Sequence, residues 1–185
     1  MDDTIRVASA QLDLTVGDLD GNSAAIEKAI SKARGLGADI VTFPELALTG
    51  YPPEDLLLKP KFIDDNFRAL ERVAKAVSDI VAVVGFVDRT PGGLFNSAAV
   101  ICGGAVRGIY HKMMLPNYGV FDEKRYFMPG TSPAVFTYGD LVFAVNICED
   151  IWHDNGPLQS QASAGARLIL NINASPYYMC KTRER

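Results

Sequence analysis

Cysteine is scarce in this chain, and long apolar runs are missing. The three cysteines show no CxxC spacing, so neither a disulfide framework nor a zinc knuckle is indicated, and a reducing cytoplasm fits best. No run reaches the roughly 18 apolar residues of a membrane span. The first residues also lack the basic start and apolar middle of a signal peptide. The sequence therefore predicts a cytoplasmic protein with no membrane partner and no bound metal.

Basic residues are also fewer than acidic ones. Lysine and arginine number 18 against 22 aspartates and glutamates, which gives a net charge of -4 and supplies no basic stripe for phosphates. We therefore expect no nucleic-acid partner. Hydrophobic residues make up 48% and charged residues 22% of the 185 residues, the composition of a folded soluble protein. This length predicts a single domain over residues 1–185.

Apolar residues recur with two different periods along the chain, and the two periods predict strands and helices in alternation. Helical spacing indicates helices over residues 22–36, 63–78 and 158–164. Strands are predicted over residues 5–14, 39–43, 80–87, 134–137, 141–147 and 166–175. Gly103 and Gly104 join two further short strands as a hairpin within residues 96–115. The pattern predicts an α/β fold with a mixed sheet.

Three polar residues of different chemistry each follow an apolar strand. Glu45 comes after IVTFP, Lys112 after VRGIYH and Cys148 after LVFAVNI. The carboxyl ends of strands are where open α/β sheets place their sites. A thiol needs a base to activate it, and a developing oxyanion needs a positive neighbour. The three residues together therefore predict an acyl-transfer site.

Each of the three also has an ordinary structural explanation. Glu45 fits a surface charge on a loop, Lys112 a solvated lysine, and Cys148 a thiol in the hydrophobic core. Solubility alone does not explain why all three stand at strand ends beside loops rich in proline or aromatic residues. Spacing by itself leaves the structural and the catalytic interpretation open.

Longer strings around the three residues resemble the Glu-Lys-Cys signature of nitrilase-superfamily amidases. These strings are PEL at Glu45, HKMMLPNYGVFDEKRYF at Lys112 and NICEDIW at Cys148. Within that superfamily, the strings LTGYPPEDLLL, LPNYGVFDEKRYF, CEDIW and NINASPY together are similar to the glutaminase domain of bacterial glutamine-dependent NAD synthetases. The match covers nearly the whole chain, so it is more specific than any single motif.

The resemblance implies a four-layer αββα sandwich with mixed sheets, in which Cys148 attacks the side-chain amide of glutamine and forms a thioester. Glu45 is then the general base, and Lys112 stabilises the oxyanion together with the backbone N–H of Glu149. The resemblance also implies that Glu123 orients the lysine. The residues that it places in contact with glutamine are Tyr118, Glu149 and Ser175.

The remaining histidines and cysteines receive no catalytic role. His111 lies one residue from Lys112, and neighbouring residues in a strand point to opposite faces. We interpret His111 and His153 as structural or surface residues. Cys102 stands in an apolar hairpin strand and Cys180 near the end of the chain, and neither is assigned a function.

The resemblance also implies partners and cofactors that lie outside this sequence. Members of the family carry a separate synthetase domain that uses ATP, Mg and deamido-NAD, and no such segment is present here, whereas the amidase step itself needs no cofactor. The ammonia would pass to a synthetase domain or subunit, and a homo-oligomer is implied. Because the family's amidase domain continues beyond the NASP strand, we expect C-terminal truncation and an uncovered sheet edge that favours aggregation or dimerisation.

Two other functions stay open at this point. The first is another nitrilase-superfamily amidase, such as a carbamoylase, with the same three residues and a different amide substrate. The second is a catalytically silent module retained for subunit assembly, in which the three polar residues form an inert cavity.

Overall fold

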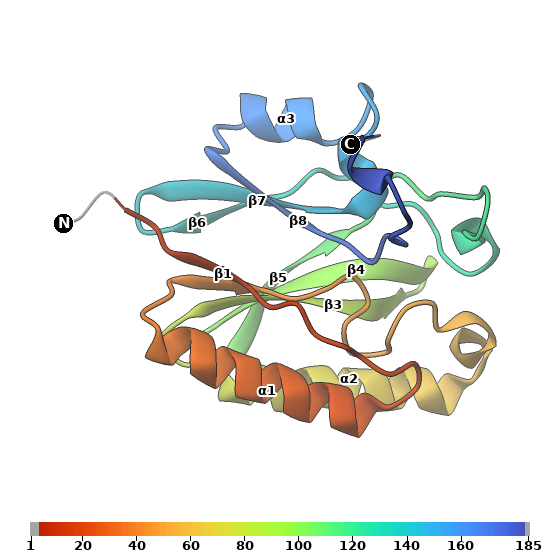
Figure 1. Ribbon diagram of the computed structural model, residues 1–185, viewed down its shortest axis with the longest axis horizontal. Coiled ribbons are helices and arrows are strands. Elements are labelled where there is room, and N and C mark those ends of the chain that lie inside the picture. Colours follow the sequence, from red (N-terminus) through yellow and green to blue (C-terminus); the bar gives the residue numbers. More distant parts are fainter. Residues whose placement is uncertain (1–3, 184–185) are drawn as a thin grey trace.

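The computed structural model describes residues 4–183, which form two mixed sheets with helices on their outer faces (Figure 1). The first sheet has the order β1-β2-β3-β4-β5, with β1, β2 and β3 parallel and β3, β4 and β5 antiparallel. In the second sheet, β6 is antiparallel and β8 parallel to the central β7. The strands are β1 (Val7–Ser9), β2 (Ile40–Thr42), β3 (Val81–Thr90), β4 (Gly93–Cys102), β5 (Ala105–His111), β6 (Val135–Tyr138), β7 (Leu141–Ile147) and β8 (Leu168–Ile172).

Two long helices cover the outer face of the first sheet, and a short one lies over the second sheet (Figure 1). They are α1 (Leu19–Gly35), α2 (Pro60–Ala76) and α3 (Leu158–Ser163). Short 3-10 turns occupy Glu54–Leu58, Glu123–Arg125, Cys148–Ile151 and Lys181–Arg183. The layers therefore run helix, sheet, sheet, helix, which confirms the predicted αββα sandwich. None of the helices within residues 4–183 has the length and apolar composition needed to cross a membrane.

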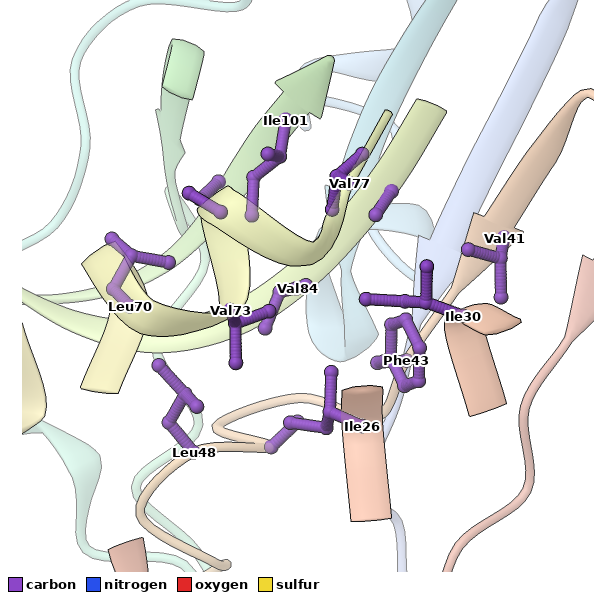
Figure 2. Close-up of a cluster of buried hydrophobic side chains, with 14 of the residues drawn as sticks. Ile26, Ile30, Val41, Phe43, Leu48, Leu70, Val73, Val77, Val84 and Ile101 are labelled. Atoms are coloured by element: carbon purple, nitrogen blue, oxygen red, sulfur yellow. The ribbon is translucent and has the colours of Figure 1, made fainter. Parts of the chain in front are cut away.

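Strand β3 shows why both layers of the core depend on the same segment. Ala82, Val84 and Phe86 pack toward α1 and α2, whereas Val81 and Val83 pack toward the second sheet. Successive side chains of a strand point to opposite faces, so a strand buried on both sides is apolar throughout. Figure 2 shows side chains of the layer between the helices and the first sheet, including Ile26, Ile30, Val73, Val77 and Val84.

The structure moves several predicted boundaries. The first strand is much shorter than predicted, because only Val7–Ser9 pairs with β2. Leu12 and Leu14 are partly buried against the first core layer without joining the sheet, so their alternation came from packing. Helix α1 begins earlier than predicted, where the side chain of Asp18 accepts a hydrogen bond from the Gly21 N–H and caps the first turn.

The strand directions bring the predicted site residues to one edge. Strand β5 runs in the same direction as β2 and β3, because two antiparallel pairings separate it from β3. The residues that follow β2 and β5 therefore leave the first sheet at the same end. Glu45 follows β2 and Lys112 follows β5. In the second sheet, the parallel pair β7 and β8 ends at Ile147 and Ile172, just before Cys148 and the segment that carries Ser175.

Candidate active site

Four buried polar side chains form what we call the buried centre: Glu45, Asn96, Lys112 and Glu123. The Nζ atom of Lys112 donates to Oε1 of Glu45 at 2.6 Å and to Oε1 of Glu123 at 2.8 Å. The Asn96 amide donates to Oε1 of Glu45 at 2.8 Å and to Oε2 of Glu123 at 3.4 Å. The lysine side chain is 0% exposed and the two carboxylates at most 5%. Two carboxylates thus share one ammonium group away from water.

The charges in the buried centre determine its protonation. Burial raises the pKa of Glu123, and the neighbouring charge of Glu45 raises it further. Burial alone lowers the pKa of Lys112, but the charges of Glu45 and Glu123, together with hydrogen bonds to both, outweigh that effect and raise it above its ordinary value. Lys112 is therefore a cation at neutral pH. Glu123 has one more partner in this region, because the hydroxyl of Tyr51 donates a hydrogen bond to its Oε1 atom at 3.0 Å.

Glu45 also connects the two sheets. Its Oε2 atom accepts a hydrogen bond from the backbone N–H of Ala174 at 3.1 Å, and its own N–H donates to the Asn173 carbonyl at 3.4 Å. Ala174 belongs to the segment that leaves β8. The next residue, Ser175, places its hydroxyl 3.1 Å from the Sγ atom of Cys148. A short path of contacts therefore joins the carboxylate to the thiol.

Cys148 occupies a sharp turn directly after β7. Its φ of 46° lies in the left-handed region, which non-glycine residues rarely adopt, and such conformations concentrate at functional sites. The residue is buried. Burial, followed by the charge of Glu45, raises the pKa of its thiol, Ser175 and Lys112 act in the opposite direction, and the net result is a pKa of about 11. The resting group is a protonated thiol.

The thiol opens onto a cavity of about 470 Å³, which we call the active-site pocket. Within it the carboxylate of Glu149 accepts a hydrogen bond from the Tyr118 hydroxyl at 2.8 Å and lies 3.0 Å from Nε2 of His153. The pocket thus combines a thiol with a carboxylate held between two polar side chains. Its lining residues are Tyr118, Phe121, Cys148, Glu149, Trp152, His153, Ser175, Pro176 and Lys181.

The structure brings together the residues that the sequence singled out. Glu45 and Lys112 meet directly, and Glu123 accepts a hydrogen bond from Lys112, while its role in orienting the lysine stays a prediction. The residues proposed to contact glutamine, Tyr118, Glu149 and Ser175, surround Cys148 in the active-site pocket. Within residues 4–183, no group of three or more His, Cys, Asp or Glu side chains is arranged to hold a metal ion.

The two histidines differ in position. His111 bonds to Asp88 at 2.7 Å and stacks on Phe95, which fits the structural role predicted for it. His153 is partly exposed, but its ring lines the active-site pocket and contacts Glu149, so it is more than a surface residue.

Sequence reasoning missed Asn96 and Tyr51 as members of this region. Asn96 stands among the apolar residues of β4, and a buried amide in such a strand needs partners. That mismatch was the available signal for Asn96. Tyr51 lies within the proline-rich loop that follows Glu45, where nothing in the local pattern indicates its contact with Glu123.

The sequence profile of carbon-nitrogen hydrolases matches residues 6–184. The chain belongs to the carbon-nitrogen hydrolase family. It is 46% identical to a glutamine-dependent NAD(+) synthetase of Xylella fastidiosa, with 100% of this chain and 34% of that protein aligned. The chain therefore spans about a third of the length of the curated relatives it matches.

Solved structures show the same relationship. The structure of the glutamine-dependent NAD+ synthetase from Acinetobacter baumannii superposes with a TM-score of 0.93 at 41% identity, covering 97% of this chain and 34% of that one. An amidase from Nesterenkonia sp. AN1 gives a TM-score of 0.82 at 26% identity, covering 98% of this chain and 70% of the amidase. The resemblance predicted from the sequence motifs, and the fold that it implied, are confirmed.

Proposed function

We propose that this chain hydrolyses the side-chain amide of glutamine to glutamate and ammonia through a thioester on Cys148. The observation that carries the proposal is the contact path from the Cys148 thiol through Ser175 and Ala174 to Glu45, whose carboxylate is itself paired with Lys112. A nucleophile, a base and a cation are the three parts that acyl transfer needs. Family membership supports the same class of chemistry.

The first half of the reaction forms the thioester. Glu45 removes the thiol proton as Sγ attacks the amide carbon, and the carbonyl π electrons move onto the oxygen. Lys112 and the backbone N–H of Glu149 stabilise that oxyanion, a kind of contribution worth about 3 to 4 kcal/mol per donor. The C–N bond then breaks, and Glu45 returns the proton to the leaving nitrogen, so ammonia departs.

The second half restores the enzyme. Glu45 removes a proton from a water molecule, and the resulting hydroxide attacks the thioester carbon. The C–S bond breaks, the sulfur takes the proton held by Glu45, and the product leaves. Glutamine and water are consumed, glutamate and ammonia are formed, and the proton of the new carboxylic acid leaves with the products, so the reaction balances without a cofactor.

The high pKa of Cys148 makes the base necessary. With a pKa of about 11, only roughly one thiol in ten thousand is ionised at pH 7. The proton must therefore be removed as the thiol attacks. Oε1 of Glu45 is occupied by Lys112 and Asn96, while Oε2 faces the Ala174–Ser175 segment that contacts Cys148. We assign Oε2 as the atom that takes the proton.

The similarity to glutamine-dependent NAD(+) synthetases supports a role for the released ammonia. Glutamine-dependent NAD(+) synthetases use glutamine, and we propose that the ammonia serves NAD synthesis from deamido-NAD in a separate synthetase domain or subunit that uses ATP and Mg. We place this activity in the cytoplasm, within a homo-oligomer.

The carboxylate of Glu149 in the active-site pocket suits the α-ammonium group of glutamine.

A second candidate is hydrolysis of another amide, since an amidase shares the fold over 98% of this chain. Comparing glutamine with carbamoyl amino acids and short aliphatic amides as substrates separates the two. A silent module, the third possibility, would hydrolyse none of them.

The test follows glutamate release from glutamine by the wild type, Cys148→Ala and Cys102→Ala. Cys102 is a partly buried thiol away from the active-site pocket, so its removal is the matched control. We expect release by the wild type and Cys102→Ala, and background rates for Cys148→Ala. Equal rates of glutamate release for the wild type and Cys148→Ala would contradict the proposal.

A further inference from the structure

Asp150 is a fully buried carboxylate that the proposed chemistry does not use. Its Oδ1 atom accepts the backbone N–H groups of Met113 and Met114 at 3.0 and 2.8 Å. Its Oδ2 atom accepts the N–H of Ile147 and the hydroxyl of Tyr110, both at 2.9 Å. A carboxylate offers about four lone-pair sites. All of them are occupied by the protein, so Asp150 has no capacity left for a substrate.

The partners of Asp150 flank two residues of the proposed mechanism. Met113 directly follows Lys112 at the end of β5, which belongs to the first sheet. Ile147 directly precedes Cys148 at the end of β7, which belongs to the second sheet. One side chain thus holds the backbone beside the proposed cation and the backbone beside the proposed nucleophile.

The hydrogen bonds of Asp150 are directional, unlike the apolar packing around them. The layer between the sheets is built from apolar side chains such as Val83, Val100 and Val145. Apolar contact is non-directional and does not by itself set how far one strand end slides past the other. Hydrogen bonds weaken steeply when their geometry is lost, so those of Asp150 fix the relative position of the two strand ends.

Asp150 also closes the turn that contains Cys148. Its hydrogen bond from the Ile147 N–H spans the nucleophile, whose φ of 46° needs support from the surroundings. The same carboxylate is anchored to the opposite sheet through Met113 and Met114. The unusual backbone of Cys148 is therefore held against the first sheet rather than against its own strand alone.

We propose that Asp150 is a positioning residue that fixes the Cys148 turn against the strand end that carries Lys112. Its effect on catalysis rests on the proposed function, whereas its effect on geometry does not. An acidic residue suits the role because all four partners are donors. In Asp150→Asn one oxygen becomes an NH₂ group, which would face a backbone N–H and repel it.

The kinetic test compares Asp150→Asn with Asp88→Asn. Asp88 is also a buried carboxylate, and it bonds to His111 next to Lys112, but within residues 4–183 its side chain has no hydrogen bond to the second sheet. For Asp150→Asn we expect kcat for glutamine to fall about 100-fold, the cost of a displacement near 1 Å, while KM changes less than about threefold. Asp88→Asn should leave kcat at the wild-type value within the error of the assay. Equal losses in the two variants overturn the proposal.

Crystal structures of the wild type and Asp150→Asn decide the geometry independently of activity. We expect the φ of Cys148 to leave the positive region, or the separation of Cys148 Sγ from Lys112 Nζ to grow by about 1 Å. An unchanged turn and separation overturn the positioning role. A wild type that releases no glutamate contradicts only the proposed function, because the two structures still test Asp150.

Tyr110→Phe provides a milder variant in case Asp150→Asn does not fold. It removes one of the four hydrogen bonds and keeps the carboxylate. We expect kcat to fall about threefold without a change in KM, with a smaller displacement of the Cys148 turn. Wild-type kcat together with wild-type geometry in this variant counts against the proposal.

Discussion

The buried centre and the active-site pocket both hold a carboxylate between two polar side chains, but they differ in access to water. Glu45 lies between Lys112 and Asn96, all of them buried. Glu149 lies between Tyr118, which is 58% exposed, and His153, whose side chain is 41% exposed.

The difference in exposure suggests different tasks. Charges act more strongly on each other where water is excluded, and dipoles fixed in advance need no reorganisation during reaction. In a partly exposed pocket, an incoming ligand can replace a side-chain partner or a water molecule. The buried centre is therefore suited to bond making and breaking, and the active-site pocket to choosing which amide enters.

Removing the cation of the buried centre should have the largest effect. Lys112→Met leaves Glu45 and Glu123 buried without their shared ammonium group, and breaking a buried pair in this way costs about 3 to 5 kcal/mol of unfolding free energy. Lys61→Met is the control, because its pair with Asp65 is on the surface and such pairs contribute about 0 to 1 kcal/mol. Urea denaturation measures both, and we expect Lys112→Met also to lose glutamine hydrolysis.

The Lys112→Met deficit should depend on pH with a definite sign. The folded-state pKa of Glu123 is already raised by burial and by Glu45, and loss of Lys112 raises it further. A carboxyl with a raised folded-state pKa contributes stability below its unfolded pKa and loses that contribution as pH rises through the folded value. The deficit should be smaller at pH 5 than at pH 8. A deficit independent of pH contradicts the charge assignment of the buried centre.

Glu45→Gln should have opposite effects on two measurements: it should slow hydrolysis and make the Cys148 thiol easier to ionise. Loss of the proposed general base should lower kcat about 10²- to 10⁴-fold. The charge of Glu45 raises the pKa of Cys148, so its removal should bring that pKa below about 11 and speed alkylation of Cys148 by iodoacetamide at pH 9. Peptide mass spectrometry measures the alkylation rate at each cysteine.

Glu71→Gln, on the exposed face of α2, is the control for this pair of opposite effects. It should change neither kcat nor the alkylation rate. If Glu45→Gln slows alkylation as well as hydrolysis, then Glu45 assists thiolate formation in the resting protein and its role as a base during attack is wrong.

The sequence located the residues at the strand ends, Glu45, Lys112 and Cys148, better than the contacts between them, for a physical reason. Strands β2 and β7 are apolar because they are buried, so their ends are visible as a change to polar residues at Glu45 and Cys148. Strand direction brings the ends of β2 and β5, and with them Glu45 and Lys112, to the same end of the first sheet. Periodicity reports burial, however, and not pairing, which is why the first strand was predicted through Leu14 although pairing with β2 ends at Ser9.

Hydrogen bonds between distant segments leave no such trace in the sequence. Asn96 meets Glu45 across 51 positions, and Asp150 meets Met113 across 37. The residues next to Asp150 in the sequence do not show whether it is a buried carboxylate bonded to both sheets or an acidic residue at the start of a short helix. His153 is similar, since its place in the active-site pocket depends on how the turn after Cys148 directs the chain.

Glu149→Gln tests whether the active-site pocket chooses the substrate, with a smaller expected effect than either change in the buried centre. If the Glu149 charge binds the α-ammonium group of glutamine, its loss should raise KM about 10- to 100-fold, the value of a charge-assisted hydrogen bond, and change kcat only a few-fold. Tyr118→Phe keeps the charge and removes one hydrogen bond, so its KM should rise only about threefold. Propionamide has no ammonium group, and its hydrolysis should be equally slow in Glu149→Gln and the wild type. A similar rise in KM for both amides would mean that Glu149 shapes the pocket without recognising the ammonium, and the division of tasks between the two regions would fail.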